Sequence, residues 1–509
     1  MSDFEIPTGW ELTNLESVVD FLDSQREPVN SSEREARIKD KPITELFPYY
    51  GATGQVGWID AFRSEGESVL LGEDGAPFLD PNKDKAYLVT GHYWVNNHAH
   101  ILSGFNNCLS TRFLCYQLNT VDYSGFVTGT TRLKLTSSAM KQIPFLLAPY
   151  NEQTRIVEKL EELFSDLDAG VAELKAAQKK LAQYRQSLLK SAVEGALTAE
   201  WRTKNKPKET GAQLLERSLK ERRARWEEKQ LAKFKEQGKT PPKGWQDKYP
   251  EPVQPDTANL PELPEGWVWT GFEALADGLP NSLKAGPFGS ALKKEYYVSK
   301  GYKIYGQEQV IRDDPYYGDY YISEEKYREL ISCAVKPGDI LVSLVGTTGK
   351  VLVLPDDAHK GIINPRLLKI SLLPSNVDPN YLKLVLESPY ARHFFKINAH
   401  GGTMEILNLG ILKSLPVMLP SIEEQKLIVE TVNDQKSEID RQVVALEFSL
   451  TQAAAQRKKI LKSAFSGQLV PQDPDDEPAS VLLGRIQEER KASNKTSKTT
   501  VKPRRKPSC

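Results

Sequence analysis

The stretch IPFLLAPYNEQTRIVEKLEELFSDLD at residues 143–168, followed by YRQSLLKSAVEGALT at 184–198, decides the fold because the chain contains it twice. The second copy reads LPVMLPSIEEQKLIVETVNDQKSEID at 415–440 and QRKKILKSAFSGQLV at 456–470. At a shift of 272, residues 143–198 and 415–470 align without a gap, and 19 of the 56 positions are identical. Self-similarity of this extent indicates a duplicated structural unit.

The duplicated unit also has a recurring start. Ile6–Trp10 reads IPTGW, and Leu263–Trp267 reads LPEGW, at a shift of 257. The two shifts differ by fifteen residues, so the material between start and repeated stretch differs in length between the copies. Its sequence has also diverged almost completely. We therefore expect a retained scaffold that carries two different domains.

Each repeated stretch predicts an apolar strand containing proline and then a long helix, with Asn151 or Ser421 as the N-cap. Apolar residues recur every seven positions along the helix, as in a coiled coil. The seam residues are Leu160, Leu167, Leu174, Leu181 and Leu188 in the first copy and Val432, Ile439, Leu446 and Ile460 in the second. About 40 helical residues, at roughly 1.5 Å each, form a rod of roughly 60 Å.

The simplest way to bury these stripes is to pack the two helices against each other, antiparallel, about a pseudo-twofold axis. The alternative is that each stripe packs on its own globular domain. Gln178, Arg185 and Arg457 also fall on the seam, where polar residues can fix the register of a helix pair.

Composition excludes several classes of protein. No run approaches the ~18 apolar residues of a membrane span, and MSDFEIPTGW is not a signal peptide, so we expect a cytoplasmic protein. The four cysteines, Cys108, Cys115, Cys333 and Cys509, have no metal-type spacing and fit a reducing compartment. Net charge is −1, so any phosphate contacts must come from local patches or from partner subunits.

Two motifs resemble a nucleotide-binding loop and a metal site but lack residues that those sites need. Gly346–Lys350 lacks the first glycine and the final Ser/Thr of a phosphate loop, and a hairpin between strands at 340–345 and 351–354 fits better. Such a tip can offer backbone N–H groups to phosphate, unless it is a plain surface turn. His92, His98 and His100 lack the partners of a metal site. Alternation along a strand places His98 and His100 on one face, as polar residues near DNA or a partner.

The motifs together resemble the specificity subunit of type I restriction-modification systems. They are the PTGW and PEGW starts, GPFGSALK at 286–293, KPGDILVS at 336–343, and the strand-EQ-helix unit ending LLKSAVEGALT. In the first half, YGATGQVG at 50–57 and WVNNHAH at 94–100 agree with this resemblance.

The resemblance implies a mixed α/β fold with two α+β target-recognition domains, each reading one half of a split DNA site, and a helix pair that sets their spacing. The expected parts are recognition domains at 1–150 and 259–422, long helices at 151–198 and 423–470, a charged linker or helical insertion at 199–258, and a partly disordered tail at 471–509, acidic and then basic.

The resemblance also implies partners. Double-stranded DNA, two methyltransferase subunits and, in a complete system, two motor and nuclease subunits would bind this chain. S-adenosylmethionine, ATP and Mg²⁺ would be held by those partners, and this chain would hold neither cofactor nor metal. It carries no methyltransferase tetrapeptide of the Asn-Pro-Pro-aromatic kind, so we expect no catalysis from it.

Side chains that can hydrogen-bond base edges from loops are the candidates for reading DNA, because Arg and Lys suit guanine and Asn and Gln suit adenine. They are Tyr50, Thr53, Gln55, Asn97 and Arg132 in the first domain and Lys284, Ser290, Thr347, Lys350, Asn364 and Arg366 in the second. Two other classes stay open: a coiled-coil protein that bridges two protein partners, and an enzyme whose active site has no recognisable motif.

Overall fold

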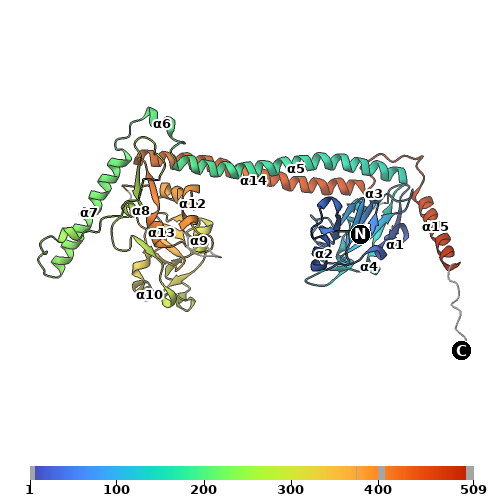
Figure 1. The fold of residues 1–509 in the computed structure, drawn as a ribbon, viewed down its shortest axis with the longest axis horizontal. Helices are drawn as coiled ribbons and strands as arrows, with labels where there is room; N and C mark the ends of the chain where they lie inside the picture. The colour runs from blue at the N-terminus through green and yellow to red at the C-terminus, as the bar shows by residue number, and fades with distance from the viewer. Residues whose placement is uncertain (1–5, 374, 399–406, 500–509) are drawn as a thin grey trace. The chain divides into compact units, whose positions relative to one another are not determined.

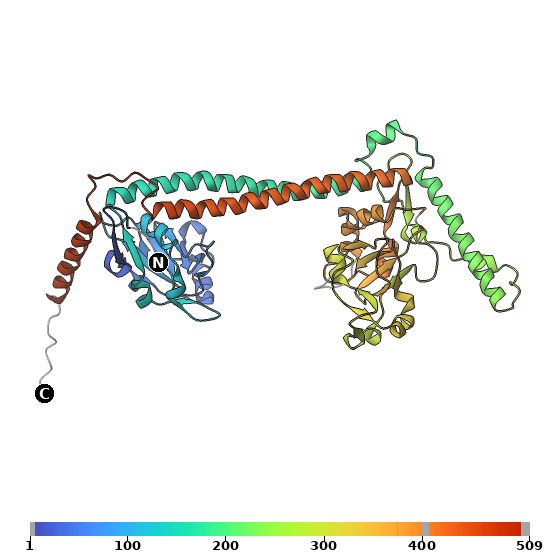
Figure 2. The same cartoon turned by 180° about the vertical axis from the view of Figure 1, so that it is seen from behind.

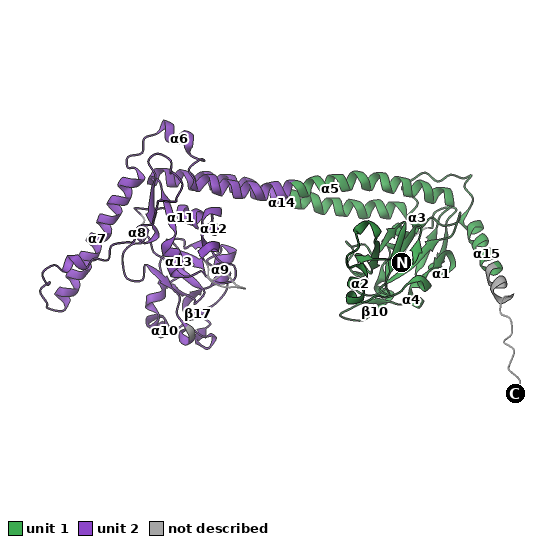
Figure 3. Ribbon diagram, viewed as in Figure 1, with its two compact units in different colours: residues 1–176, 446–509 green, residues 177–445 purple. Residues whose placement is uncertain are grey.

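The computed structural model describes residues 6–373, 375–398 and 407–499, which fall into two compact units (Figure 3). Unit 1 combines residues 1–176 with 446–509, and unit 2 is residues 177–445. Cys509 and the end of the predicted tail lie outside the described residues. The predicted long helices are present as α5 (Tyr150–Val193) and α14 (Ile422–Ala464), and each contributes to both units.

Unit 1 is built on two four-stranded sheets, with strand orders β2-β9-β6-β7 and β4-β3-β8-β5. Their strands are β2 (Val19–Phe21), β3 (Phe47–Gly51), β4 (Gly54–Ile59), β5 (Ser64–Glu65), β6 (Ser68–Gly72), β7 (Ala86–Val89), β8 (His92–Val95) and β9 (Ala99–Gly104). Two-stranded ribbons are formed by β1 (Glu11–Asn14) with β12 (Pro144–Leu147) and β10 (Val127–Thr128) with β11 (Lys134–Leu135). The helices include α1 (Leu15–Val18), α2 (Ser31–Ile38), α3 (Thr111–Leu118) and α4 (Ser137–Lys141).

Unit 2 contains a four-stranded sheet, β14-β22-β19-β20, and a five-stranded sheet, β15-β17-β16-β21-β18. Their strands are β14 (Leu283–Ala285), β15 (Tyr297–Val298), β16 (Tyr302–Tyr305), β17 (Tyr321–Ile322), β18 (Ala334–Val335), β19 (Ile340–Ser343), β20 (Val351–Val353), β21 (Gly361–Ile363) and β22 (Leu367–Ile370). A ribbon joins β13 (Val268–Gly271) to β23 (Pro416–Leu419). The helices include α8 (Phe272–Leu275), α9 (Gln307–Arg312), α10 (Glu324–Glu329), α11 (Pro379–Glu387), α12 (Pro389–Asn398) and α13 (Leu409–Ser414).

The two units share one topology although their intervening sequences have diverged. In each, the strand after the PxGW start pairs antiparallel with the proline-containing strand before the long helix. The sheet β2-β9-β6-β7 has the strand order of β14-β22-β19-β20, and the parallel pair of β3 and β8 corresponds to that of β16 and β21. The repeat therefore extends through the segments in which sequence comparison finds no similarity.

A buried hydrogen bond ties the start of each domain to its long helix. The indole nitrogen of Trp10 donates to Glu152 at 3.0 Å, and that of Trp267 donates to Glu424 at 2.9 Å. A buried indole N–H needs an acceptor, and the first turn of a helix favours an acidic residue. These two needs explain why Trp and Glu recur together in both copies.

The glutamine after each of these glutamates joins the long helix to a second helix. Gln153 accepts a bond from the backbone N–H of Ser110, and Gln425 accepts one from that of Asp378, both at 2.8 Å. Ser110 and Asp378 are the N-caps of α3 and α11. The repeated Glu-Gln pair is therefore part of the scaffold.

The segment after each long helix belongs to the repeat as well. In unit 2, α7 (Gly211–Glu236) begins with a bond from Gly211 N–H to the carbonyl of Gly266, at 2.7 Å. In unit 1, α15 (Ala479–Thr499) begins with a bond from Ala479 N–H to the carbonyl of Gly9, at 2.9 Å. Helix α7, which runs outward from unit 2 in Figures 1 and 2, is thus the counterpart of α15.

Ion pairs and burial support the same equivalence. Arg217 binds Glu209, and Arg485 binds Glu477, in each case eight residues upstream. Leu214 and Leu482 occupy matching positions and are both buried in their units' cores. The shift between these pairs is 268, four fewer than between the long helices, because the connecting segments differ in length.

Helices α5 and α14 lie side by side within each unit (Figures 1 and 2). Of the predicted seam residues, Leu160, Leu188, Val432 and Ile439 are buried. The others are partly covered: Leu167, Leu174, Leu181, Leu446 and Ile460. The seam is most deeply buried where a globular domain also covers it.

Candidate nucleic-acid interface

In unit 1, polar residues gather around a turn at residues 96–98, between β8 and β9. The backbone N–H of Asn96 donates to the carbonyl of Tyr50 at 3.0 Å. The Asn96 side-chain oxygen accepts from the N–H of His98 at 2.8 Å, an Asx turn. The imidazole Nδ1 of His98 lies 2.7 Å from Asp74, which also binds Arg132 at 2.7 Å.

The structure brings most of the first domain's candidates to this edge. Tyr50 lies on β3 and pairs with Gln55 of β4, and Thr53 lies in the turn between these strands. Asn97 is exposed in the turn at 96–98, and the Arg132 side chain is 61% exposed. The amide of Gln55 donates to the carbonyl of Gly57 in its own strand. Base contacts by these residues stay predictions.

In unit 2, an equivalent turn at residues 364–366 lies between β21 and β22. Asn364 N–H donates to the carbonyl of Tyr305 at 2.9 Å, and the Asn364 side chain accepts from Arg366 N–H at 2.9 Å. The Arg366 guanidinium is exposed and contacts Gln307 at 3.4 Å. The N–H of Leu344 donates to the carbonyl of Arg366 at 2.9 Å, which places the loop carrying Thr347 beside the turn.

The predicted hairpin around Gly346–Lys350 is confirmed, since β19 pairs antiparallel with β20. Phosphate binding by the tip of this hairpin stays a prediction, although three of its backbone N–H groups already have partners. The N–H groups of Thr348 and Gly349 bond carbonyls of the same hairpin, and that of Lys350 bonds the Ser343 hydroxyl.

The sequence-based candidate set missed Phe288, which lies on a loop beside Arg366. Gly286 N–H donates to the carbonyl of Leu367 at 2.9 Å, so the loop that continues to Ser290 lies next to the Asn364 turn. A Cβ at Gly286 would lie 1.9 Å from the Asn364 carbonyl oxygen, so only glycine fits. Phe288, at the tip, is 88% exposed. An aromatic residue between glycines was the signal that could have identified it.

Lys284 lies on β14, opposite Lys369 of β22 in the same sheet, and Ser290 is exposed just beyond Phe288. Three neighbouring strands, β14, β22 and β19, and the loops at their ends therefore carry Lys284, Ser290, Thr347, Lys350, Asn364 and Arg366.

The predicted pairing of His98 and His100 on one strand face is wrong, because β9 begins at Ala99 and leaves His98 in the turn. His100 is 1% exposed, and its Nδ1 lies 2.7 Å from Asp23. Burial alone would raise the pKa of the Asp23 carboxyl. The hydrogen bonds from His100 and from the Ile101 N–H, with the charges of His100 and Arg26, together outweigh burial, so the pKa lies below its ordinary value. His100 is thus an internal structural group.

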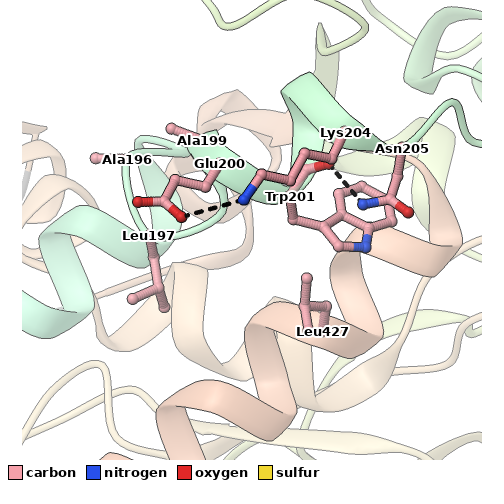
Figure 4. A pocket seen from close by; sticks show the side chains of 8 residues that line it. All are labelled: Ala196, Leu197, Ala199, Glu200, Trp201, Lys204, Asn205 and Leu427. Atoms are coloured by element: carbon pink, nitrogen blue, oxygen red, sulfur yellow. Dashed lines mark hydrogen bonds and ion pairs between the residues drawn. The ribbon is translucent and has the colours of Figure 1, made fainter.

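A shallow pocket lies at the far end of the long helices in unit 2, between α6 (Ala199–Lys204) and α14 (Figure 4). Its wall includes Trp201 and Leu427, and Glu200 and Lys204 form an ion pair at its rim. Its lining includes none of the candidate base-reading residues. In unit 1 the position of Leu427 is taken by Arg155, which pairs with Asp476 at 2.7 Å.

Among residues 6–373, 375–398 and 407–499, no cluster of His, Cys, Asp and Glu side chains could hold a metal ion. No helix in the same ranges has the length and apolar character needed to cross a bilayer.

The duplicated fold defines a protein with two domains of one architecture, each with its own polar turn surface. The chain is a member of the type I restriction modification DNA specificity domain family, whose model matches residues 7–176 and 288–443. It is a specificity subunit with two DNA-recognition domains.

Relatives support this assignment. The Escherichia coli EcoDI specificity subunit is 23% identical over 97% of this chain and 98% of its own length. A Haemophilus influenzae type I specificity subunit is 35% identical over 29% of this chain and 36% of its own. A chain from a solved type I restriction-modification complex has the same fold, with a TM-score of 0.60 and 16% identity, covering 92% of this chain and 100% of that one.

Proposed function

We propose that the two domains read separate halves of a split DNA target. The supporting observation is that both domains present the same kind of turn but differ in the side chains that project from it, His98 and Asn97 in one and Arg366 in the other. Equivalent surfaces with different hydrogen-bonding groups suit two different half-sites.

Helices α5 and α14 would set the spacing between the half-sites as an antiparallel coiled coil. Each helix is unbroken over more than forty residues, and lateral contacts in both units join one helix to the other. A continuous helix transmits distance because its rise per residue is fixed at roughly 1.5 Å.

The same helices would dock two methyltransferase subunits. On α14, Val444 is 65% exposed in unit 2 and Phe448 is 64% exposed in unit 1. Exposed apolar side chains beside a half-buried seam suit a helical partner. The methyltransferases would bring S-adenosylmethionine, and motor and nuclease subunits would bring ATP and Mg²⁺, so this chain would direct chemistry without performing it.

A domain exchange tests the proposal. Residues 1–150 are replaced by the first domain of another family member, and the methylated sites are mapped in cells that also express the cognate methyltransferase. One half of the methylated site should change while the other half and the spacing stay the same. A change in both halves, or in neither, would overturn the modular assignment.

Experiments on the purified protein distinguish this proposal from the two alternatives, a protein that bridges two protein partners and an enzyme without a recognisable motif. A bridging protein would give no sequence-dependent DNA retention with or without the methyltransferase, and a fused enzyme would methylate adenine as an isolated chain supplied with S-adenosylmethionine. We expect sequence-dependent retention with the methyltransferase present and no methylation by the isolated chain.

A further inference from the structure

The turns at 96–98 and 364–366 are held by the same three constraints, each of them a hydrogen bond. The first is the bond from Asn96 or Asn364 to the carbonyl of Tyr50 or Tyr305, at 3.0 and 2.9 Å. Each asparagine therefore continues a parallel strand pair, that of β3 and β8 or of β16 and β21.

The second constraint is the Asx bond, in which the asparagine side chain accepts from the N–H of the residue two positions later. The third is a hydrogen bond to the carbonyl of that same residue. The carbonyl of His98 accepts from Glu73 N–H at 2.7 Å, and the carbonyl of Arg366 accepts from Leu344 N–H at 2.9 Å. Glu73 and Leu344 follow the equivalent strands β6 and β19. His98 and Arg366 thus occupy the same position in the two domains.

A glycine after each tyrosine completes the turn. A Cβ added at Gly51 would lie 3.2 Å from the Asn96 amide nitrogen, and one at Gly306 would lie 2.8 Å from that of Asn364. Both distances are too short for comfortable packing, so the Tyr-Gly pair and the asparagine form one arrangement. The tyrosines are shifted by 255 and the asparagines by 268, which hides this equivalence from comparison at a single shift.

Only the projecting side chains differ. The His98 side chain is 40% exposed and its Nδ1 is held by Asp74, which leaves Nε2 on the other edge of the ring. Arg366 is exposed, and Val345, not an acid, takes the position of Asp74. The middle residue of the turn is Asn97 in one domain and Pro365 in the other, and proline has no side-chain donor.

We infer that His98 and Arg366 are equivalent specificity positions, each selecting a base in the half-site of its own domain. Arg366 would select guanine through its O6 and N7 atoms, and His98 would present Nε2 to a base edge. A turn with a fixed backbone and one exchangeable side chain allows recognition to change without a change in fold. This inference rests on the proposed half-site function.

One substitution at each position tests the inference in the full chain, which is expressed with the cognate methyltransferase and read by mapping methylated sites. R366Q should relax or change one base pair in one half of the site, and H98R should do so in the other half. The expected loss at the original base is about tenfold or more, which corresponds to the discrimination of a bidentate contact. The exposed Lys300 and Lys39 supply matched controls, K300Q and K39Q, which should leave the motif intact.

Several results would overturn the inference. If R366Q and H98R left the motif unchanged, or if both altered the same half, the two positions would not be equivalent readers. A uniform loss of methylation with an unchanged motif would make the residue a phosphate contact. If the wild-type complex gave no sequence-specific methylation, the proposed function itself would be wrong. The wild-type result thus distinguishes failure of the proposed function from failure of this inference.

Discussion

Arg185 is ion-paired with Asp440 on the neighbouring long helix. The residues 272 positions away, Arg457 and Asp168, pair with each other at 2.8 Å in the other unit. Each ion pair thus joins the arginine of one copy to the aspartate of the other. The polar seam residues Arg185 and Arg457 are therefore each ion-paired with an aspartate of the other long helix.

Charge reversal tests these helix contacts. Both pairs are largely exposed, so neutralising one with D440N should cost less than about 1 kcal/mol. D440R should lower the thermal midpoint further, because it places two like charges together. The exchanged variant R185D/D440R should recover most of the loss, as measured by circular dichroism at 222 nm. Failure of the exchange to recover stability would mean that the two side chains do not meet in solution.

Glu152 and Glu424 provide a matched pair in which the same substitution should have different effects. Burial raises the pKa of Glu152 above 4.5 despite the Trp10 bond, with the nearby charge of Arg155 opposing the shift and that of Asp476 adding to it. A raised pKa contributes stability that is present below the unfolded value of about 4.5 and lost as pH rises through the folded value. At pH 7, burial of the ionised Glu152 carboxylate lowers the stability of unit 1. E152Q removes the ionisable group and should therefore be neutral or stabilising at pH 7.

Glu424 accepts hydrogen bonds from Trp267, Thr198 and Arg202. E424Q should destabilise unit 2 by about 2 kcal/mol, because it removes charge-assisted bonds in a buried site. Thermal unfolding of both variants between pH 4 and pH 8 checks the contrast. Equal destabilisation by the two substitutions at pH 7 would contradict it.

Asp23 should stabilise unit 1 in a pH-dependent way. Its lowered pKa means that the carboxylate contributes stability above the unfolded value of about 3.8, and that this stability is lost as pH falls through the folded value. D23N removes the charged partner of buried His100 and should cost about 3 kcal/mol at pH 7. The difference from wild type should shrink towards pH 3 in denaturant titrations, and a constant difference would argue against the ion pair.

Helix α15 should be part of the folded first unit. Leu482 is 1% exposed and lies in the same core as Trp10 and Phe113. L482A should therefore destabilise unit 1 by about 3 kcal/mol, and the matched variant L214A should do the same to unit 2. Limited proteolysis with mass spectrometry can assign each effect to its unit. Unchanged protection of unit 1 in L482A would exclude this packing role.

The extent of sequence-based prediction follows from how the copies diverged. The long helices and the Glu-Gln pair were predictable because one shift of 272 covers them. The equivalence of α7 and α15 was not predictable, because the segments that connect them to the long helices differ in length by four residues and the shift there is 268. The strand assignment that placed His98 and His100 on one face failed because the turn at residues 96–98 separates β8 from β9 and leaves only His100 in a strand. Alternation of side chains holds only within an unbroken strand.

Phe288 should contribute to DNA binding without contributing to stability. It is 88% exposed, and the close approach of Gly286 to Asn364 fixes its loop beside the Arg366 turn. Burying a phenylalanine is worth about 2 kcal/mol, and apolar side chains of this kind insert between base steps in several DNA-binding proteins. F288A should weaken binding of the methyltransferase complex to its target duplex by roughly thirtyfold and leave the thermal midpoint unchanged. Fluorescence anisotropy would measure the affinity, with V253A as the control because Val253 is 74% exposed in the same unit. If F288A and V253A bound DNA equally well, Phe288 would not lie in the interface.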